Sequence, residues 1–189
     1  MVAEPNPPLM TVAEYLDYER TSQIKHEYLG GRLYAMAGGS RAHGVIAVNI
    51  LSLLRSHLRG SPCRVYSHDV KLQITEEHYV YPDASVGCDT RDRANDGRED
   101  VVRYPKLAVE VLSPSTEAYD RGGKFALYRE KNTLREYVLV AGDRQVVEVF
   151  RRDTDGLWTL HPFGPADHLT LESIGFNCPV ASFYEDVDL

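Results

Sequence analysis

The most constraining feature of the sequence is an apolar run that carries a single acid. Between Lys106 and Leu112 every residue is apolar except Glu110, and Pro114 follows closely. A short apolar run ended by a proline is typical of a central strand that is covered on both faces of its sheet. A carboxylate in such a strand is costly to bury unless a cation or a metal ion compensates it. Glu110 alone therefore predicts either a buried ion pair or a metal site.

A second acid occupies a comparable place on the strand before it. Residues 63–74 alternate in polarity as a strand does, with Lys71 on the polar face, and Tyr79–Cys88 reads as a partner strand. Pro82 lacks an amide donor, which predicts an edge position or a local break just before Asp83. A lone Pro-Asp pair is more often an exposed turn. Two acids on successive strands, however, offer the hard oxygen ligands that Mg²⁺ or Mn²⁺ binds, and such an ion stabilises charge on a phosphoryl group.

The segment after the Glu110 strand is predicted to be a helix with one functional face. Asp120, Lys124 and Tyr128 are spaced by four residues, so a regular helix places them on the same side. Gly122-Gly123 weakens its first turn, which leaves the start of the helix open. Lys124 is thus a candidate to meet the two acids. The alternative is a surface Asp-Lys pair, which contributes only a few tenths of a kcal/mol.

The remaining pattern completes a fold of the α/β class (α+β by some conventions), a mixed sheet flanked by helices with an antiparallel β extension. Its other predicted elements are a helix from the capping box at Thr11 to about Glu19, a hairpin over His26–Met36, a helix from Ser40 to Gly60, a strand over Glu136–Val140, a hairpin of Gln145–Arg151 with Leu157–His161, and a short element near Ser182–Asp186. We expect one domain over residues 1–189, with residues 1–10 loosely ordered and a mobile surface loop over Asp89–Asp100.

Composition restricts the compartment and the partners. No apolar run approaches the roughly 20 residues that a membrane span needs, and the N-terminus does not resemble a signal peptide. The three cysteines are scattered, which argues against a zinc knuckle or a disulfide framework and favours a reducing cytoplasm. The formal net charge of −7 argues against broad nucleic-acid binding. It does not exclude a nuclease, because the acids of a metal site lower the net charge.

Five stretches, taken in order, resemble a known family. They are KHEYLGGRLYAMAGGSRAH, YPDASV, VEVLSPST, YDRGGKFALY and LREYVLV. The chain resembles the Uma-type restriction endonuclease-like family of the PD-(D/E)xK nuclease superfamily, and Pro82-Asp83 and Glu110-Val111-Leu112 fall in the places of its two motifs. The resemblance implies a restriction endonuclease-like fold and an endonuclease that uses Mg²⁺ or Mn²⁺, with DNA as the expected substrate. We also expect a homodimer, the common arrangement for such folds. The alternative is a catalytically inactive module on the same fold that binds nucleic acid or protein.

One position departs from the superfamily pattern. The lysine expected two residues after the second acid is Leu112 here. Some branches supply the amine from the following helix, and Lys124 lies where that substitution would place it. Lys71 is the rival amine. The resemblance also places Glu27, as a further acid, and His43, as a phosphate contact or proton-transfer group, near the pocket; without it, surface or capping roles are expected for both. Asp83 and Glu110 would hold the metal, with the Val111 carbonyl as a further candidate ligand.

Overall fold

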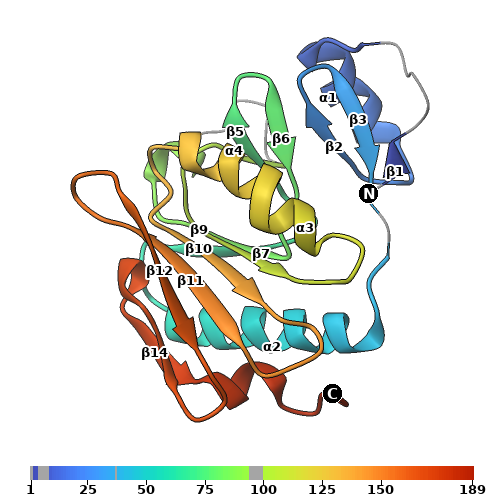
Figure 1. The fold of residues 1–189 in the computed structure, drawn as a ribbon. Coiled ribbons are helices and arrows are strands. Elements are labelled where there is room, and N and C mark those ends of the chain that lie inside the picture. The colour runs from blue at the N-terminus through green and yellow to red at the C-terminus, as the bar shows by residue number, and fades with distance from the viewer. Residues whose placement is uncertain (1, 4–8, 37, 94–99) are drawn as a thin grey trace.

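The computed structural model describes residues 2–3, 9–36, 38–93 and 100–189, and within them the strands form two six-stranded sheets and one two-stranded sheet (Figure 1). In the six-stranded sheet that contains Glu110, called the core sheet, strands β9 (Pro105–Val111) and β10 (Glu136–Val140) run parallel, and the other neighbours run antiparallel. This mixed sheet, with its antiparallel extension, confirms the predicted fold class. In spatial order the core sheet consists of β12 (Trp158–Phe163), β11 (Val147–Arg152), β10 (Glu136–Val140), β9 (Pro105–Val111), β7 (Ala84–Gly87) and β4 (Arg64–Ser67).

The second sheet is built mainly from the N-terminal part of the chain. Its helix α1 (Val12–Thr21) begins at the predicted capping box of Thr11 and Glu14. The predicted hairpin turns at Gly30-Gly31, where both glycines have a positive φ. Val2–Ala3 pairs with this hairpin, whereas residues 1 and 4–8 of the expected tail lie outside the described residues. In spatial order the strands are β1 (Val2–Ala3), β3 (Arg32–Ala35), β2 (His26–Leu29), β6 (His78–Val80), β5 (Lys71–Thr75) and β8 (Val101–Val102).

Helices cover both faces of the core sheet. The long helix α2 (Arg41–His57), capped by Ser40, lies along one face and buries Ile46, Ile50 and Leu54 against it (Figure 1). The other face is covered by α3 (Glu117–Tyr119), the π-helical turn η2 (Asp120–Lys124) and α4 (Phe125–Glu130), with part of the second sheet. Glu110 lies on a strand buried between these layers, as its apolar neighbours predicted.

Two segments that were predicted to be single strands are each divided into two shorter strands. Residues 63–74 form β4 and β5 with a turn between them, in which the amide of Val70 donates to the Ser67 carbonyl over 3.1 Å. Tyr79–Cys88 is divided between β6 and β7 at the break expected before Asp83. At each break the chain passes from one sheet to the other, because a continuous strand would have to belong to both sheets.

The cysteines require a further correction. The structure joins Cys63 and Cys88 in a disulfide, although their scatter in the sequence argued against such bonds. The reason is the antiparallel pairing of Arg64 with Gly87, which places Cys63, just before Arg64, opposite Cys88, just after Gly87. Cys178 is free and buried.

The C-terminal part of the chain adds a hairpin that the sequence pattern did not reveal. Strands β13 (His168–Leu171) and β14 (Phe176–Pro179) pair antiparallel, joined by the 3₁₀ turn η3 (Glu172–Ile174). The predicted short element near residue 182 is the 3₁₀ turn η4 (Val180–Tyr184). In the expected surface loop, η1 (Thr90–Arg93) forms a turn, and residues 94–99 lie outside the described residues. Among the helices that the structure describes, none is long and apolar enough to cross a membrane.

Candidate active site

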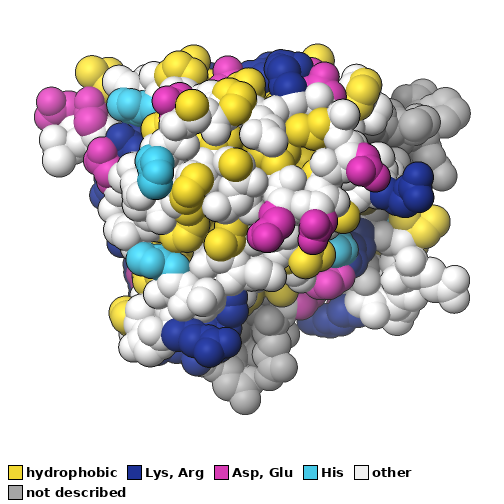
Figure 2. Space-filling model, turned by 90° about the horizontal axis from the view of Figure 1, so that it is seen from below, with side chains coloured by type: hydrophobic (Ala, Val, Ile, Leu, Met, Phe, Trp, Pro, Cys, Tyr) yellow, Lys and Arg dark blue, Asp and Glu magenta, His cyan; other side chains and the backbone are white. Residues whose placement is uncertain are grey.

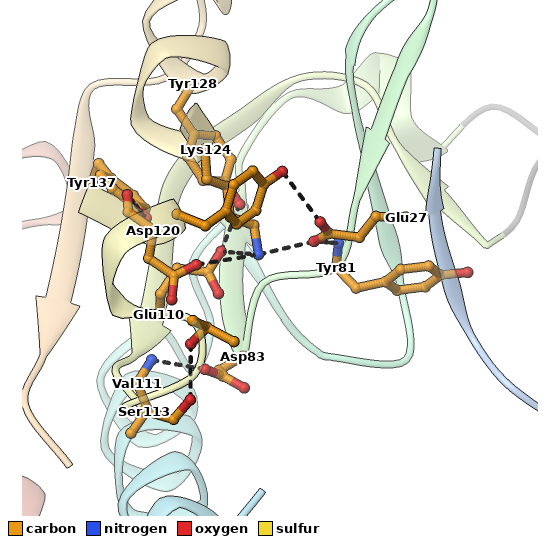
Figure 3. Close-up of polar contacts among 12 residues, drawn as sticks. Glu27, Tyr81, Asp83, Glu110, Val111, Ser113, Asp120, Lys124, Tyr128 and Tyr137 are labelled. Atoms are coloured by element: carbon orange, nitrogen blue, oxygen red, sulfur yellow. Dashed lines mark hydrogen bonds and ion pairs between the residues drawn. The ribbon is translucent and has the colours of Figure 1, made fainter. Parts of the chain in front are cut away.

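The two acids of the predicted site meet at one end of the core sheet. Ala84 pairs with Val109, so the same register, continued by one residue, places Asp83 opposite Glu110. Residues directly opposite in an antiparallel pair point to the same face, with Cβ atoms about 4.5–5.5 Å apart. Both line a cavity of about 350 Å³. Figure 3 shows the two side chains in this arrangement.

Asp83 is held by two groups at the start of β7. Its Oδ2 accepts a hydrogen bond from the Val111 amide over 2.7 Å and lies 3.2 Å from Nε2 of His43. The Asp83 carboxylate thus accepts from a backbone amide of β9 just beyond the last pair of β7 and β9, Ala84 with Val109. His43 is in the first turn of α2, and a Cβ at Gly39 would come within 2.7 Å of its Nδ1. A glycine at position 39 therefore leaves room for the ring to face Asp83.

Lys124 reaches the acids from the helical layer. Its Nζ lies 2.9 Å from Oε1 of Glu110 and 2.9 Å from Oε1 of Glu27, with side chains that are no more than 6% exposed. The Tyr128 hydroxyl donates to the same Glu110 oxygen over 2.9 Å. The ammonium group therefore bridges two buried carboxylates that come from different sheets.

Glu27 brings the second sheet into the site. It lies on β2, only 2% exposed, and its Oε1 also accepts from the Tyr81 amide over 3.3 Å. The Tyr119 hydroxyl donates to its Oε2 over 3.4 Å. The charged segment around Glu27 suggested a surface acid, but the structure buries it within the site.

The helix that carries Lys124 is not regular. Residues Asp120–Lys124 form a π-helical turn, in which Lys124 Nζ lies 4.0 Å from Oδ1 of Asp120. Short π-helical segments occur often at functional sites, because the wider turn re-aims the side chains. Gly123 leaves the Tyr119 ring space, since a Cβ there would lie 3.1 Å from it. Asp120, Lys124 and Tyr128 still share the buried face, as their spacing predicted.

The buried charges of the site are more often negative than positive: Glu27, Glu110 and Asp120 surround the single cation Lys124. Burial raises the pKa of the Glu110 carboxyl well above its usual value, even though the Lys124 charge acts in the opposite direction. Burial also raises the pKa of Asp120. For Lys124, burial alone would lower the pKa, but the charges of Glu110 and Glu27 outweigh it and raise that pKa well above its usual value. The hydrogen bond to Asp83 raises the pKa of His43. The lysine therefore stays charged, while the acids favour any additional cation.

The oxygens that remain free suit a divalent cation. Among the described residues, hydrogen bonds and ion pairs engage Oδ2 of Asp83 and Oε1 of Glu110, which leaves Oδ1 and Oε2 without a protein partner, and both residues line the cavity. No cluster of three or more His, Cys, Asp or Glu side chains among these residues is arranged to hold a metal. Mg²⁺ requires less, because it binds through one or two carboxylates and completes its shell with water and phosphate. The two residues therefore fit such an ion.

Lys71 lies outside this site. Its side chain pairs with Asp100 and lies over the Tyr81 ring, 5.8 Å from its centroid, beside a second cavity. The break between β4 and β5 accounts for this position, because it moves Lys71 into the second sheet. Of the two candidate amines, the structure thus brings Lys124 to the acids.

Several residues of the site had no recognisable signal in the sequence. Tyr119 and the Tyr81 amide fix Glu27, and the Tyr137 hydroxyl donates to the Asp120 carbonyl over 3.0 Å. Arg144, on the turn after β10, lines the cavity together with Lys124 and the acids. Tyr119 directly precedes Asp120 in the sequence, and this position is the signal that could have identified it. The roles of Tyr81, Tyr137 and Arg144 depend on tertiary contacts.

The sequence matches a known protein family and is similar to two known proteins. The model of the Uma2 family, described as "Putative restriction endonuclease", matches residues 12–181. Two uncharacterized proteins of Synechocystis sp. are similar: slr1290 is 43% identical over 178 residues, covering 94% of this chain and 92% of that protein, and sll1609 is 32% identical over 153 residues, covering 80% and 86%.

A solved structure has the same fold. It is described as a putative nuclease belonging to DUF820 from Anabaena variabilis, and it superposes with a TM-score of 0.77 at 18% identity, covering 93% of this chain and 98% of that one. At this identity the likeness concerns the fold alone. The match of the family model over nearly the whole chain identifies the lineage directly: the protein belongs to the Uma2 family of restriction endonuclease-like proteins.

Proposed function

We propose that the protein is a Mg²⁺- or Mn²⁺-dependent endonuclease that hydrolyses phosphodiester bonds, with DNA as the expected substrate. The observation that carries the proposal is the position of Lys124. Its ammonium group lies in one cavity with Asp83 and Glu110, each of which keeps one oxygen free. Two free carboxylate oxygens and a fixed cation form a suitable environment for a phosphodiester under attack by water.

The residues of the site would divide the work between holding the metal and orienting the reactants. Asp83 and Glu110 would hold the ion, which when bound supplies positive charge to the phosphoryl oxygens. Lys124 would donate hydrogen bonds to the attacking water and to the oxygens that gain charge as the new P–O bond forms and the ester P–O bond breaks. The charges of Glu110 and Glu27 raise the pKa of Lys124, so it would stay protonated and donate hydrogen bonds. The proton of the attacking water would then pass to solvent, and the leaving oxygen would take up a proton from solvent.

The supporting residues would keep these groups in place. Glu27 and Tyr128 flank the Lys124 and Glu110 pair, and His43 holds one oxygen of Asp83. Because Nε2 of His43 faces Asp83, a positioning role is favoured over a direct phosphate contact. Asp120 adds a further buried carboxylate 4.0 Å from Lys124.

The contact of Lys124 with the acids also favours an enzyme over an inactive binding module. In a module that had lost turnover, Lys124 would serve only as the counter-ion of the buried acids, and a lysine that pointed into solvent would have supported such a module. The proposal includes a homodimer, because two sites related by symmetry are a common way to cut both strands of a duplex. Sedimentation equilibrium measures that state.

The proposal is tested with Asp83→Asn and with Asp17→Asn as a matched control, since Asp17 has a side chain that is 76% exposed on α1. Mn²⁺ at about 100 times its Kd should stabilise the wild type by about 2.7 kcal/mol, which raises the Tm of a protein of this size by roughly 5–11 °C. Asp83→Asn should lose this rise and the cleavage of DNA, whereas Asp17→Asn should keep both. An equal Mn²⁺ effect in wild type and Asp83→Asn would place the ion elsewhere. Absence of metal-dependent cleavage of DNA and RNA would leave the binding module as the better account.

A further inference from the structure

Another buried acid, Glu19, lies outside the site and has hydrogen-bond partners of its own. It is in the last part of α1, with a side chain that is 2% exposed. Its Oε1 accepts from the His26 amide over 2.8 Å and from the Tyr81 hydroxyl over 3.0 Å, and its Oε2 lies 3.1 Å from Nδ1 of His26. A carboxylate buried this deeply is retained only where its partners compensate the loss of water. Glu19 thus fastens α1 to β2 and to Tyr81.

Tyr81 connects this network to the candidate active site. Its ring points away from the acids of the site, while its backbone amide donates to Oε1 of Glu27, the oxygen that also binds Lys124 (Figure 3). The residue opens the segment Tyr81-Pro82-Asp83, which crosses from β6 of the second sheet to β7 of the core sheet. Pro82 fixes one backbone angle of this segment. The ring therefore anchors one end of a three-residue segment whose other end carries the Asp83 carboxylate.

We propose that Glu19 and Tyr81 are positioning residues, which through the Tyr81–Asp83 segment hold the Asp83 carboxylate and Glu27 in register with Glu110 and Lys124. The consequence for metal binding and cleavage rests on the proposed function. The consequence for the position of Asp83 does not. The Tyr81 hydroxyl is the donor in its contact with Glu19, because a carboxylate oxygen only accepts.

The Val111 amide provides a direct reading of where Asp83 lies, because its hydrogen bond goes to Oδ2 of that residue. Tyr81→Phe removes one hydroxyl and keeps the ring. The matched control is Tyr28→Phe: Tyr28 is 3% exposed, compared with 4% for Tyr81, and its hydroxyl donates to the Met10 carbonyl over 2.7 Å without touching Glu19. We expect the Val111 amide to exchange with solvent on the order of tenfold or more faster in Tyr81→Phe, and at the wild-type rate in Tyr28→Phe.

Metal binding gives the second reading. Partners that hold a metal ligand typically change metal affinity by about 10–100-fold when they are removed. We expect a loss of this size in the Mn²⁺ affinity of Tyr81→Phe and Glu19→Ala, measured by calorimetry. Glu19→Gln should restore most of it, because the amide oxygen can still accept from the Tyr81 hydroxyl and the His26 amide.

The possible results separate the two proposals. If the Val111 amide exchanges at the same rate in Tyr81→Phe as in the wild type, or if Tyr28→Phe accelerates it equally, Glu19 and Tyr81 only stabilise the fold and the positioning role is refuted. If the wild type binds no Mn²⁺, the proposed nuclease function fails, and the Val111 exchange rates still decide whether the segment is positioned from α1.

Discussion

Substitution of Lys124 by methionine removes one charge from a buried cluster and keeps most of the side-chain length. Lys124 bridges Glu27 and Glu110 at 2.9 Å each, and both of these side chains are no more than 6% exposed. The substitution leaves two carboxylates without their cation in an environment that water enters poorly. The fold should therefore lose stability, apart from any effect on catalysis.

The expected loss follows from what is known of buried ion pairs. Removing one member of such a pair costs about 3–5 kcal/mol, because the remaining charge stays buried and uncompensated. For a protein of this size each kcal/mol corresponds to a fall of roughly 2–4 °C in Tm, which gives about 6–20 °C in total. Glu27→Gln in the same chain removes one of the two stranded charges, so the double variant should be less destabilised than the sum of the single ones.

Urea unfolding followed by circular dichroism measures these differences, provided that the m-value stays constant. Lys25→Met is the matched control: Lys25 pairs with Asp69, but the two side chains are 35% and 64% exposed. An exposed pair of this kind contributes about 0–1 kcal/mol. If Lys124→Met costs no more than Lys25→Met, the buried bridge between the two sheets does not exist as described. Mn²⁺ should recover part of the loss, because it brings positive charge to Glu110.

Two further predictions concern the amine and the pH. Lys124→Arg should lower the cleavage rate by about 10²–10³-fold, the effect of losing one well-placed hydrogen-bond donor, because arginine keeps the charge but not the shape. Lys71→Ala should cost much less; single-turnover cleavage compares the two variants, and the opposite ranking would move the amine to β5. Burial raises the pKa of Glu110, so the folded state holds its proton more strongly than the unfolded state. Without metal, the contribution of Glu110 to the free energy of unfolding should therefore fall as the pH rises above 4.5, the usual pKa of a glutamate. Mn²⁺ should stabilise the protein more at higher pH. Tm curves of the wild type and Glu110→Gln from pH 5 to 8 test this, and parallel curves would contradict it.

The local signals in the sequence predicted the elements that local chemistry decides. The capping box of Thr11 and Glu14, the Gly30-Gly31 turn and the Ser40 cap all occur where the pattern placed them. Pro82 indicated the break between β6 and β7, but the break between β4 and β5 was less accessible, because alternation continues across it. The alternation of polar and apolar residues shows which face of a strand is buried, and the strands of both sheets have one such face. Only the tertiary structure shows that the two halves belong to different sheets.

The site shows the same division. Asp83, Glu110 and Lys124 could be selected from the sequence, because an acid in an apolar strand and a lysine at helical spacing are local patterns. Glu27 could not be placed in this way. Its neighbours Lys25 and His26 are polar, and its burial depends on Tyr81 and Tyr119, which approach it from other elements. The π-helical turn was also invisible, although Gly122-Gly123 marked the place where a regular helix is weakest.

The charge that argued against nucleic-acid binding is concentrated where a metal ion would meet it. Among the described residues that line the cavity are the six acids Glu27, Asp83, Glu110, Glu117, Asp120 and Asp143, against the two cations Lys124 and Arg144. On the face that carries α2, the described Lys and Arg side chains are dispersed and do not form a continuous patch (Figure 2). A phosphodiester would therefore be repelled from the cavity as long as its acids are uncompensated. A divalent ion reduces this excess of negative charge, because it adds two positive charges beside Asp83 and Glu110. In the proposed nuclease, metal binding is thus a condition for binding the scissile phosphate, and the acidic composition is part of the site.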